Sequence, residues 1–263
     1  MREAMVMSAF GDERRERILH EVMAHGKATV TGLSELLGVT TETIRKDLVT
    51  LGERNVISKR HGFVTLATPM PERDSEKGES LHLAEKTAIA ERAARLIPQD
   101  AAVFLDTSTT VLCLASLLAL RSDLTVITNS IDVCQALACS GSKILVTGGL
   151  YRTKSNSCVG SWALRSMESV NVDVAFLGCD GFSPEGPTIR SYQEVEFKRM
   201  VARRAKRTVL LADTSKLGNT GLYTFANYAD FSLMIFEREL NVGERKVLPK
   251  NVALIDIATP TSE

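Results

Sequence analysis

The chain has 263 residues, of which 44% are hydrophobic and 24% are charged, and its 32 basic side chains balance its 32 acidic ones. These values are ordinary for a globular protein with a buried core, and the length suits a small domain followed by a medium one. They exclude a polycation that binds nucleic acid along its whole length, so any contact with DNA has to come from a local basic patch.

The cysteines and the apolar runs indicate the compartment. Five cysteines occur, without a C-x-x-C pair and without a Cys/His cluster at zinc spacing. We therefore expect small buried thiols in a reducing environment, no metal site and no cofactor. No apolar run approaches the roughly 18 residues of a membrane span, and residues 1–12 lack the core of a signal peptide. The sequence predicts a cytoplasmic protein.

Residues 12–68 are predicted to form one unit of three short helices and a hairpin. The first helix covers about Glu13–Ala24, and the second covers about Thr31–Leu37. After a glycine-containing turn, Thr40 can cap a third helix, in which apolar residues recur at positions i, i+4 and i+7, namely Ile44, Leu48 and Leu51. Two helices joined by a short turn of this kind indicate a helix-turn-helix.

The third helix and the following hairpin carry the expected DNA contacts. Hydroxyls at the helix start can approach phosphates, and Arg45 has the planar fork that reads guanine in the major groove. The apolar runs Val56–Ile57 and Phe63–Leu66 flank a basic glycine turn, which is typical of a wing that meets the DNA backbone or minor groove. The alternative is a small interaction domain whose basic face is only solvated. The predicted DNA-binding residues are Thr40, Thr41, Glu42, Thr43, Arg45, Lys46, Lys59, Arg60 and His61.

Residues 69–82, with two prolines and six charged side chains, are predicted to be a linker. From residue 83 to 258, apolar runs alternate with helical patterns. The expected strands are Ala101–Leu105, Leu124–Thr128, Lys143–Thr147, Val172–Leu177, Thr208–Leu211 and Phe231–Phe236, and the expected helices are Ile89–Ile97, Thr110–Ala119, Ile131–Ala138 and Glu194–Ala205. This alternation predicts an α/β domain of Rossmann-like type, with a mostly parallel sheet covered on both faces.

Small and polar residues follow several of the expected strands. Ligands of open parallel sheets bind outside the carboxyl ends of the strands, and a hydroxyl-rich loop at a helix N-terminus suits a phosphate. Such a loop can also serve only as a helix cap. The candidate effector-binding residues are Asp106, Thr107, Ser108, Thr109, Thr110, Thr128, Asn129, Ser130, Gly148, Gly149, Asp180, Gly181 and Lys216. Arg152 and Lys154 either reach the same ligand or are solvated, and the lone Trp162 is expected to serve in packing or in an interface.

Several segments resemble the DeoR family of bacterial regulators. In the N-terminal unit they are residues 14–19, residues 33–48 and Lys59-Arg60-His61-Gly62, although Phe63 stands where the family usually has a second glycine. In the second unit, Asp-Thr-Ser-Thr-Thr, Thr-Asn-Ser, Gly-Gly, Gly-x-Asp-Gly, Glu-x-x-x-Lys and Ala-Asp-Thr-Ser-Lys are similar, in this order, to the family's sensor domain. That domain is similar in fold to ribose-5-phosphate isomerase and CoA transferases.

The resemblance implies a repressor of a carbohydrate-metabolism operon, released from double-stranded operator DNA by a phosphorylated sugar. It also adds Glu194 and Lys198 to the effector-binding residues. One recognition helix reads too few base pairs for specificity, so we expect a homo-oligomer, either a dimer or a tetramer. Two alternatives stay open: a sugar-phosphate isomerase-like enzyme that uses Asp106, Asp180, Glu194 and Lys216, and an adaptor without a DNA target.

Overall fold

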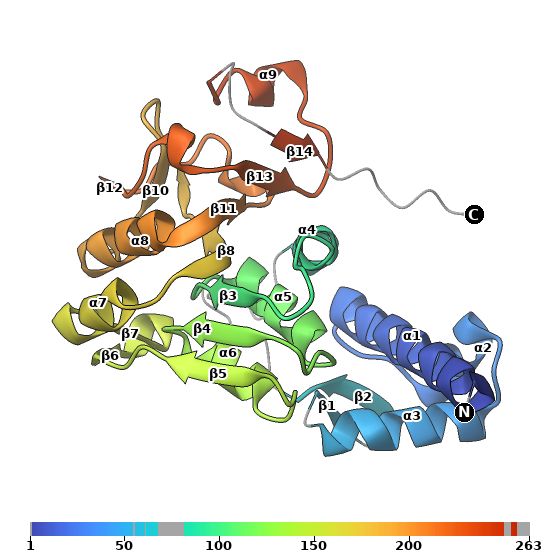
Figure 1. Ribbon diagram of the computed structural model, residues 1–263. Coiled ribbons are helices and arrows are strands. Elements are labelled where there is room, and N and C mark those ends of the chain that lie inside the picture. Colours follow the sequence, from blue (N-terminus) through green and yellow to red (C-terminus); the bar gives the residue numbers. More distant parts are fainter. Residues whose placement is uncertain (1, 55, 61, 68–81, 250–253, 257–263) are drawn as a thin grey trace.

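The computed structural model describes residues 2–54, 56–60, 62–67, 82–249 and 254–256, with side chains described from residue 11 to 249 within these ranges (Figure 1). His61 and nearly all of the predicted linker, residues 69–82, lie outside the described residues. The chain folds into an N-terminal head followed by a larger α/β domain.

The head contains the predicted helices and hairpin. Its elements are α1 (Arg2–His25), α2 (Val30–Leu37), α3 (Thr41–Glu53) and the antiparallel strands β1 (Ile57–Arg60) and β2 (Phe63–Leu66). Gly38 takes a left-handed conformation, with φ of 64°, at the end of α2, and the Thr40 side chain then accepts a hydrogen bond from the Thr43 N–H to cap α3. Apolar side chains of all three helices and both strands close the core of the head, among them Leu19, Leu33, Leu48, Ile57 and Val64.

Helix α1 begins at Arg2, well before the predicted start at about residue 13. The segment Arg2-Glu3-Ala4-Met5 consists of strong helix formers, and no proline precedes the first apolar stripe. The prediction relied on that stripe, which begins only at Ile18, and therefore missed the earlier turns.

The α/β domain is built on one parallel sheet with strand order β14-β13-β11-β8-β3-β4-β5. All of its strand pairs are parallel, which confirms the predicted fold class. The strands are β3 (Ala102–Leu105), β4 (Thr125–Thr128), β5 (Lys143–Val146), β8 (Val172–Gly178), β11 (Ala205–Leu211), β13 (Leu233–Phe236) and β14 (Leu254–Asp256), and the helices between them are α4 (Leu83–Ala94), α5 (Thr109–Leu118), α6 (Ile131–Leu137), α7 (Ser161–Glu168) and α8 (Tyr192–Arg204).

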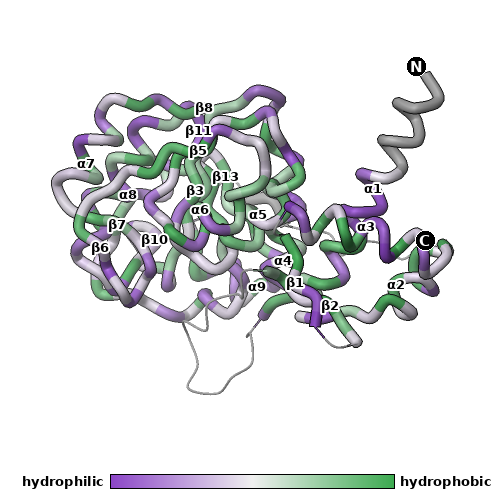
Figure 2. The backbone as a smooth tube through the Cα atoms, turned by 90° about the horizontal axis from the view of Figure 1, so that it is seen from below, coloured by the Kyte–Doolittle hydropathy of each residue, from purple (hydrophilic) through white to green (hydrophobic). Residues whose placement is uncertain are grey.

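The sheet is buried on both faces, because successive side chains of a strand point to opposite sides. On β3, Val103 and Leu105 join the apolar cluster that contains α4 and α5, whereas Phe104 joins the cluster that contains α7 and α8. Figure 2 shows the hydrophobic segments gathered in the strands and the hydrophilic ones around the periphery.

Short elements that the sequence patterns did not predict decorate the strand ends. Helix α7 and strand β14 were not predicted either. The short elements are β6 (Leu150–Arg152), η1 (Thr153–Ser155), β7 (Ser157–Val159), β9 (Gly181–Phe182), β10 (Pro187–Ile189), η2 (Thr214–Lys216), β12 (Tyr223–Thr224), η3 (Tyr228–Asp230) and α9 (Val242–Arg245). They are too short for a periodic pattern, which explains why the sequence analysis overlooked them.

The head packs directly on the α/β domain. Helix α1 lies against α4 and α5, as Figure 1 shows, and one apolar cluster runs through both parts. At this contact the His20 Nε2 atom lies 3.0 Å from the Glu91 Oε1 atom. A hydrogen bond to Glu91 raises the pKa of His20 although partial burial opposes the charged form.

The cysteines only partly match the expectation of buried thiols. Cys113 and Cys158 are buried, whereas Cys139 is exposed. Cys139 follows the end of α6 at Leu137 and lies in an exposed turn, although the residues before it are apolar. None of the described helices combines the length and apolar character that crossing a membrane requires.

Candidate DNA-binding and effector sites

The outer face of α3 presents the predicted DNA-reading side chains. Glu42, Arg45 and Lys46 are exposed, and the Arg45 side chain retains 63% of its accessible surface. An exposed ion pair joins the Arg45 Nη1 atom to the Glu42 Oε2 atom at 3.6 Å. Such a pair is weak in water, so Arg45 is free to reach a base edge in the major groove.

The remaining predicted residues of the head surround this face. The hydroxyls of Thr40 and Thr43 bond to each other over 2.9 Å, so they serve first to start α3, while Thr41 begins the helix and is half-buried. Lys59 and Arg60 are exposed on β1, the first strand of the predicted wing.

Asp47 fixes the orientation of α3 from its inner side. Its carboxylate is buried and accepts hydrogen bonds from Arg14 Nε at 2.5 Å and from Arg14 Nη2 at 3.1 Å. Arg15 Nη1 adds a third contact at 3.3 Å. A bidentate guanidinium–carboxylate pair is geometrically strict, so it ties the register of α3 to α1.

A cleft of about 210 Å³ lies at the carboxyl ends of β3, β8 and β11. It brings together eight of the predicted effector residues: Thr107, Ser108, Thr109, Thr110, Asp180, Glu194, Lys198 and Lys216. The same cleft is lined by Arg152, Lys154, Ser155, Gly178, Cys179, Arg190 and Ser191, among others. Basic side chains outnumber acidic ones around it, which suits an anionic ligand.

The α5 N-terminus opens onto this cleft. Ser108 caps the helix by accepting a hydrogen bond from the Val111 N–H at 3.1 Å. The first N–H groups of a helix have no partner inside it, so those at Thr109 and Thr110 are suited to a phosphate. Gly178 makes this approach possible, because a Cβ atom there would lie 2.3 Å from the Ser108 Cβ atom.

Lys198 lines the cleft, and Asp106 lies behind it without lining the cleft itself. Both are buried, and the Lys198 ammonium donates to the Asp106 carboxylate and, at 2.9 Å, to the Gly178 carbonyl oxygen. The Gly178 N–H in turn donates to Asp106 at 2.9 Å. Burial lowers the pKa of Lys198, but the attraction of Asp106 and Glu194 outweighs it and leaves that pKa above its ordinary value.

Arg152 and Glu194 close one wall. The Arg152 Nη1 atom donates to Glu194 Oε1 at 2.8 Å and to Ser155 Oγ at 2.9 Å. Burial raises the pKa of Glu194, although Lys198 and Arg152 pull it downward. Burial also raises the pKa of the neighbouring Cys179 thiol to about 12, so the thiol stays protonated at neutral pH.

The other predicted effector residues do not line the cleft. They are Asp106, which lies behind Lys198, and Thr128, Asn129, Ser130, Gly148, Gly149 and Gly181. Most of them follow β4 and β5, which lie beyond β3 toward one edge of the sheet. Their roles are local: Thr128 donates to the Leu105 carbonyl oxygen at 2.6 Å, and Ser130 caps α6.

Arg190 and Ser191 were missed by the sequence analysis. They follow β10, a strand of three residues that leaves no periodic signal, and the Arg190 N–H donates to Asp180 at 2.8 Å. Arg152 and Lys154, whose role was left open, lie in the cleft wall because β6 and η1 turn back toward α8.

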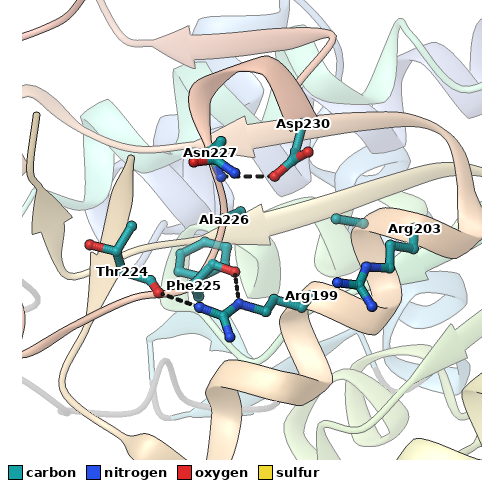
Figure 3. Close-up of a pocket in the computed structure, with 8 residues that line it drawn as sticks. Arg199, Arg203, Thr224, Phe225, Ala226, Asn227 and Asp230 are labelled. Atoms are coloured by element: carbon teal, nitrogen blue, oxygen red, sulfur yellow. Dashed lines mark hydrogen bonds between the residues drawn. The ribbon is translucent and has the colours of Figure 1, made fainter. Parts of the chain in front are cut away.

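A second hollow, of about 450 Å³, lies between α8 and η3 (Figure 3). Arg199 crosses it and donates to the carbonyl oxygens of Phe225 at 3.0 Å and Thr224 at 3.1 Å. It contains none of the predicted effector residues. Across the described part of the chain, no cluster of three or more His, Cys, Asp or Glu side chains is arranged to hold a metal ion.

A winged helix-turn-helix whose third helix exposes Arg45 and Lys46, joined to a parallel α/β domain with a charged cleft, defines a transcription regulator with a sensor domain. The DeoR-like helix-turn-helix domain matches residues 14–69, and the DeoR C terminal sensor domain matches residues 81–238. The chain belongs to the DeoR family.

The chain is similar, over nearly its whole length, to proteins named as transcriptional repressors. The chain is 35% identical over 244 residues to the HTH-type transcriptional repressor GlcR of Bacillus subtilis, covering 92% of this chain and 94% of the relative. It is 31% identical over 243 residues to a putative aga operon transcriptional repressor of Escherichia coli O157:H7, covering 90% of both. Ribose 5 phosphate isomerase A from Neisseria gonorrhoeae is 16% identical, with a TM-score of 0.38 over 51% of this chain and 52% of that one.

Proposed function

We propose that this protein represses a carbohydrate-metabolism operon and that a phosphorylated sugar in the strand-end cleft lowers its affinity for operator DNA. The observation that carries the proposal is the α5 N-terminus, which faces the cleft together with Arg152 and Lys216. A helix N-terminus and two cations suit a phosphate dianion, and the carboxylates of Asp180 and Glu194 suit sugar hydroxyls. Two relatives are named as transcriptional repressors, one of them of an operon, which supports the repressor part of the proposal.

Helix α5 offers a route from the cleft to the head. Its ten residues extend about 15 Å. The N-terminal end lines the cleft, whereas Leu117 and Leu118 at the other end line a groove of about 550 Å³ together with Leu19 and His20 of α1. A ligand that shifts α5 therefore changes the surface on which α1 packs. Helix α1 in turn carries Arg14, which binds Asp47 and so orients α3.

The head uses α3 in the major groove and the β1–β2 wing on the backbone. Arg45 reads a base, while Lys46, Lys59 and Arg60 contact phosphates. Two heads are needed for a specific site, so the working form is a homo-oligomer.

Catalysis is the weaker alternative. A general base needs a carboxylate that is free to take a proton from the substrate. Asp106 is bound to Lys198 and Glu194 to Arg152, while Asp180 accepts a hydrogen bond from the Arg190 N–H. Two of the three candidate carboxylates are thus held in ion pairs, which favours binding of an anion over its conversion.

A thermal-shift screen tests the ligand class. Phosphorylated sugars are compared with the same sugars lacking phosphate, since a ligand at 100 times its Kd stabilises the native state by about 2.7 kcal/mol. We expect a rise in Tm with at least one phosphorylated sugar only, its loss in Lys216→Ala, and its retention in Lys246→Ala, an exposed control outside the cleft. Equal shifts from unphosphorylated sugars would reject the proposal.

A further inference from the structure

Five large apolar side chains are exposed within residues 145–162. They are Leu145, Val146, Leu150, Tyr151 and Trp162, with exposed fractions from 45% for Leu145 to 70% for Trp162. They come from β5, β6 and α7. The Ser166 hydroxyl of α7 donates to the Thr147 carbonyl oxygen at 2.8 Å, and Gly149 packs on Ala163, so these elements are neighbours. We call these five residues the edge patch. Leu145 and Val146 are successive residues of β5, so they point to opposite faces of the sheet and leave both sides of this edge apolar.

The edge patch borders a free strand edge. Strand β5 is the terminal strand of the sheet and pairs with β4 alone among the described residues, as Figure 1 shows. Exposed edges are usually blunted by charges or proline, yet β5 reads Lys-Ile-Leu-Val, with one charge at its start. Its outward backbone groups and flanking apolar side chains are suited to pairing with another strand.

We infer that the edge patch and β5 form the interface with a second copy of this chain, related by a twofold axis. This inference rests on the proposed function, because specific DNA binding needs two heads and one chain supplies one. An isologous contact has to be self-complementary. An antiparallel β5 pair with its axis between Ile144 and Leu145 sets Lys143 opposite Val146 of the partner subunit, so no like charges meet.

The required area also favours strand pairing. A stable dimer buries roughly 800 Å² per partner. Five partly exposed side chains provide only a part of that area, so a dimer also has to bury the backbone edge of β5 and its exposed rim residues Lys143 and Arg165.

The interface is connected to the effector cleft through β6. Leu150 and Tyr151 belong to the edge patch, and the next residue, Arg152, lines the cleft and bonds to Glu194 at 2.8 Å. A phosphate that draws Arg152 away from Glu194 moves the strand that carries the apolar side chains. Effector binding is thereby coupled to the dimer contact as well as to the packing of α1 on α5.

Sedimentation of the full chain over a dilution series tests this interface without DNA or effector. Leu150→Glu and Trp162→Arg change exposed side chains, and Leu222→Glu, at a position 76% exposed outside the edge patch, is the matched control. We expect the wild type and the Leu222→Glu control to form dimers. In each patch variant, the Kd of the dimer should rise at least about tenfold. Circular dichroism and Tm check that every variant is folded.

A monomeric wild type, or patch variants that dimerise like the wild type, would overturn the inference. As a second measurement, a photo-crosslinking residue in place of Tyr151 should yield a covalent dimer; crosslinks only to other protein, or none, count against it. DNA binding is scored separately. If the patch variants lose the dimer but the wild type binds no DNA, the interface is supported and the proposed function is rejected.

Discussion

Lys198 donates to Asp106 beneath the effector cleft, and both side chains are shielded from water, with 5% and 1% of their surfaces exposed. The ammonium also bonds to the Gly178 carbonyl oxygen and lies 5.2 Å from the centre of the Phe225 ring. The Lys198 ammonium thus forms its hydrogen bonds within the protein, where they join α8 to the ends of β3 and β8. Lys216 occupies the rim of the same cleft and is half-buried.

The two lysines should therefore respond differently to substitution. Lys198→Met leaves the Asp106 carboxylate buried without its cation, which costs about 3–5 kcal/mol of unfolding free energy. Lys216→Met should cost less than about 1 kcal/mol yet remove the response to ligand. Urea denaturation and ligand-induced Tm shifts measure both effects. A stable Lys198→Met protein would show that the pair is not structural.

The Arg14–Asp47 pair predicts a second contrast, between a residue that stabilises the head and a residue that contacts DNA. Asp47→Asn should lower unfolding free energy by about 1.5–3 kcal/mol, because it weakens the charge-assisted hydrogen bonds from Arg14 and Arg15. Arg45→Ala should change stability by less than about 0.5 kcal/mol but weaken operator binding by about 1–3 kcal/mol. Chemical denaturation and DNA titration are run on both variants. Wild-type DNA affinity in Arg45→Ala would remove α3 from the interface.

Lys59 is expected to contact phosphate rather than bases. Lys59→Ala should weaken binding equally on specific and random DNA and reduce the slope of log K against log salt by about 1. The salt titration with Lys246→Ala should match the wild type, because Lys246 is exposed on the α/β domain. A sequence-dependent loss in Lys59→Ala would point instead to base reading by the wing.

The raised pKa of His20 makes the head contact sensitive to pH. A group whose pKa is higher in the folded state stabilises that state fully below its unfolded value, near 6.5, and loses the effect as pH rises through the folded value. The stability difference between wild type and His20→Gln should therefore be larger at about pH 5.5 than at about pH 8.5. Urea midpoints at both values measure it. A difference independent of pH would mean that the Glu91 contact does not depend on charge.

The fold was largely predictable because its long elements carry strong local signals. The apolar spacing of Ile44, Leu48 and Leu51 marked α3, and the hydrophobic runs marked the sheet strands β3, β4, β5, β8, β11 and β13. Elements of two or three residues, such as β10 and β12, depend on tertiary contacts and leave no such pattern. The early start of α1 was missed because helix propensity alone sets those turns.

The site was predictable only in part, since strand ends do not all converge. The loops after β3, β8 and β11 meet in the cleft, whereas the residues directly after β4 and β5 do not line it, and only the later β6–η1 segment returns to it. Thr128 and Gly149 share the composition of the cleft residues but support the backbone instead: a Cβ atom on Gly149 would lie 2.6 Å from the Val159 carbonyl oxygen. The residue types near a strand end indicate a loop that could bind a ligand. Only the order of the strands in the sheet determines which of these loops lie close enough to bind the same ligand.

The most direct test of the whole account is fluorescence anisotropy on DNA selected in vitro by the protein, with and without each phosphorylated sugar. We expect one such sugar to lower DNA affinity by roughly 5- to 150-fold, with Lys216→Ala binding the DNA normally and ignoring the sugar. Failure to select any DNA, or a release by sugar that persists unchanged in Lys216→Ala, would contradict it.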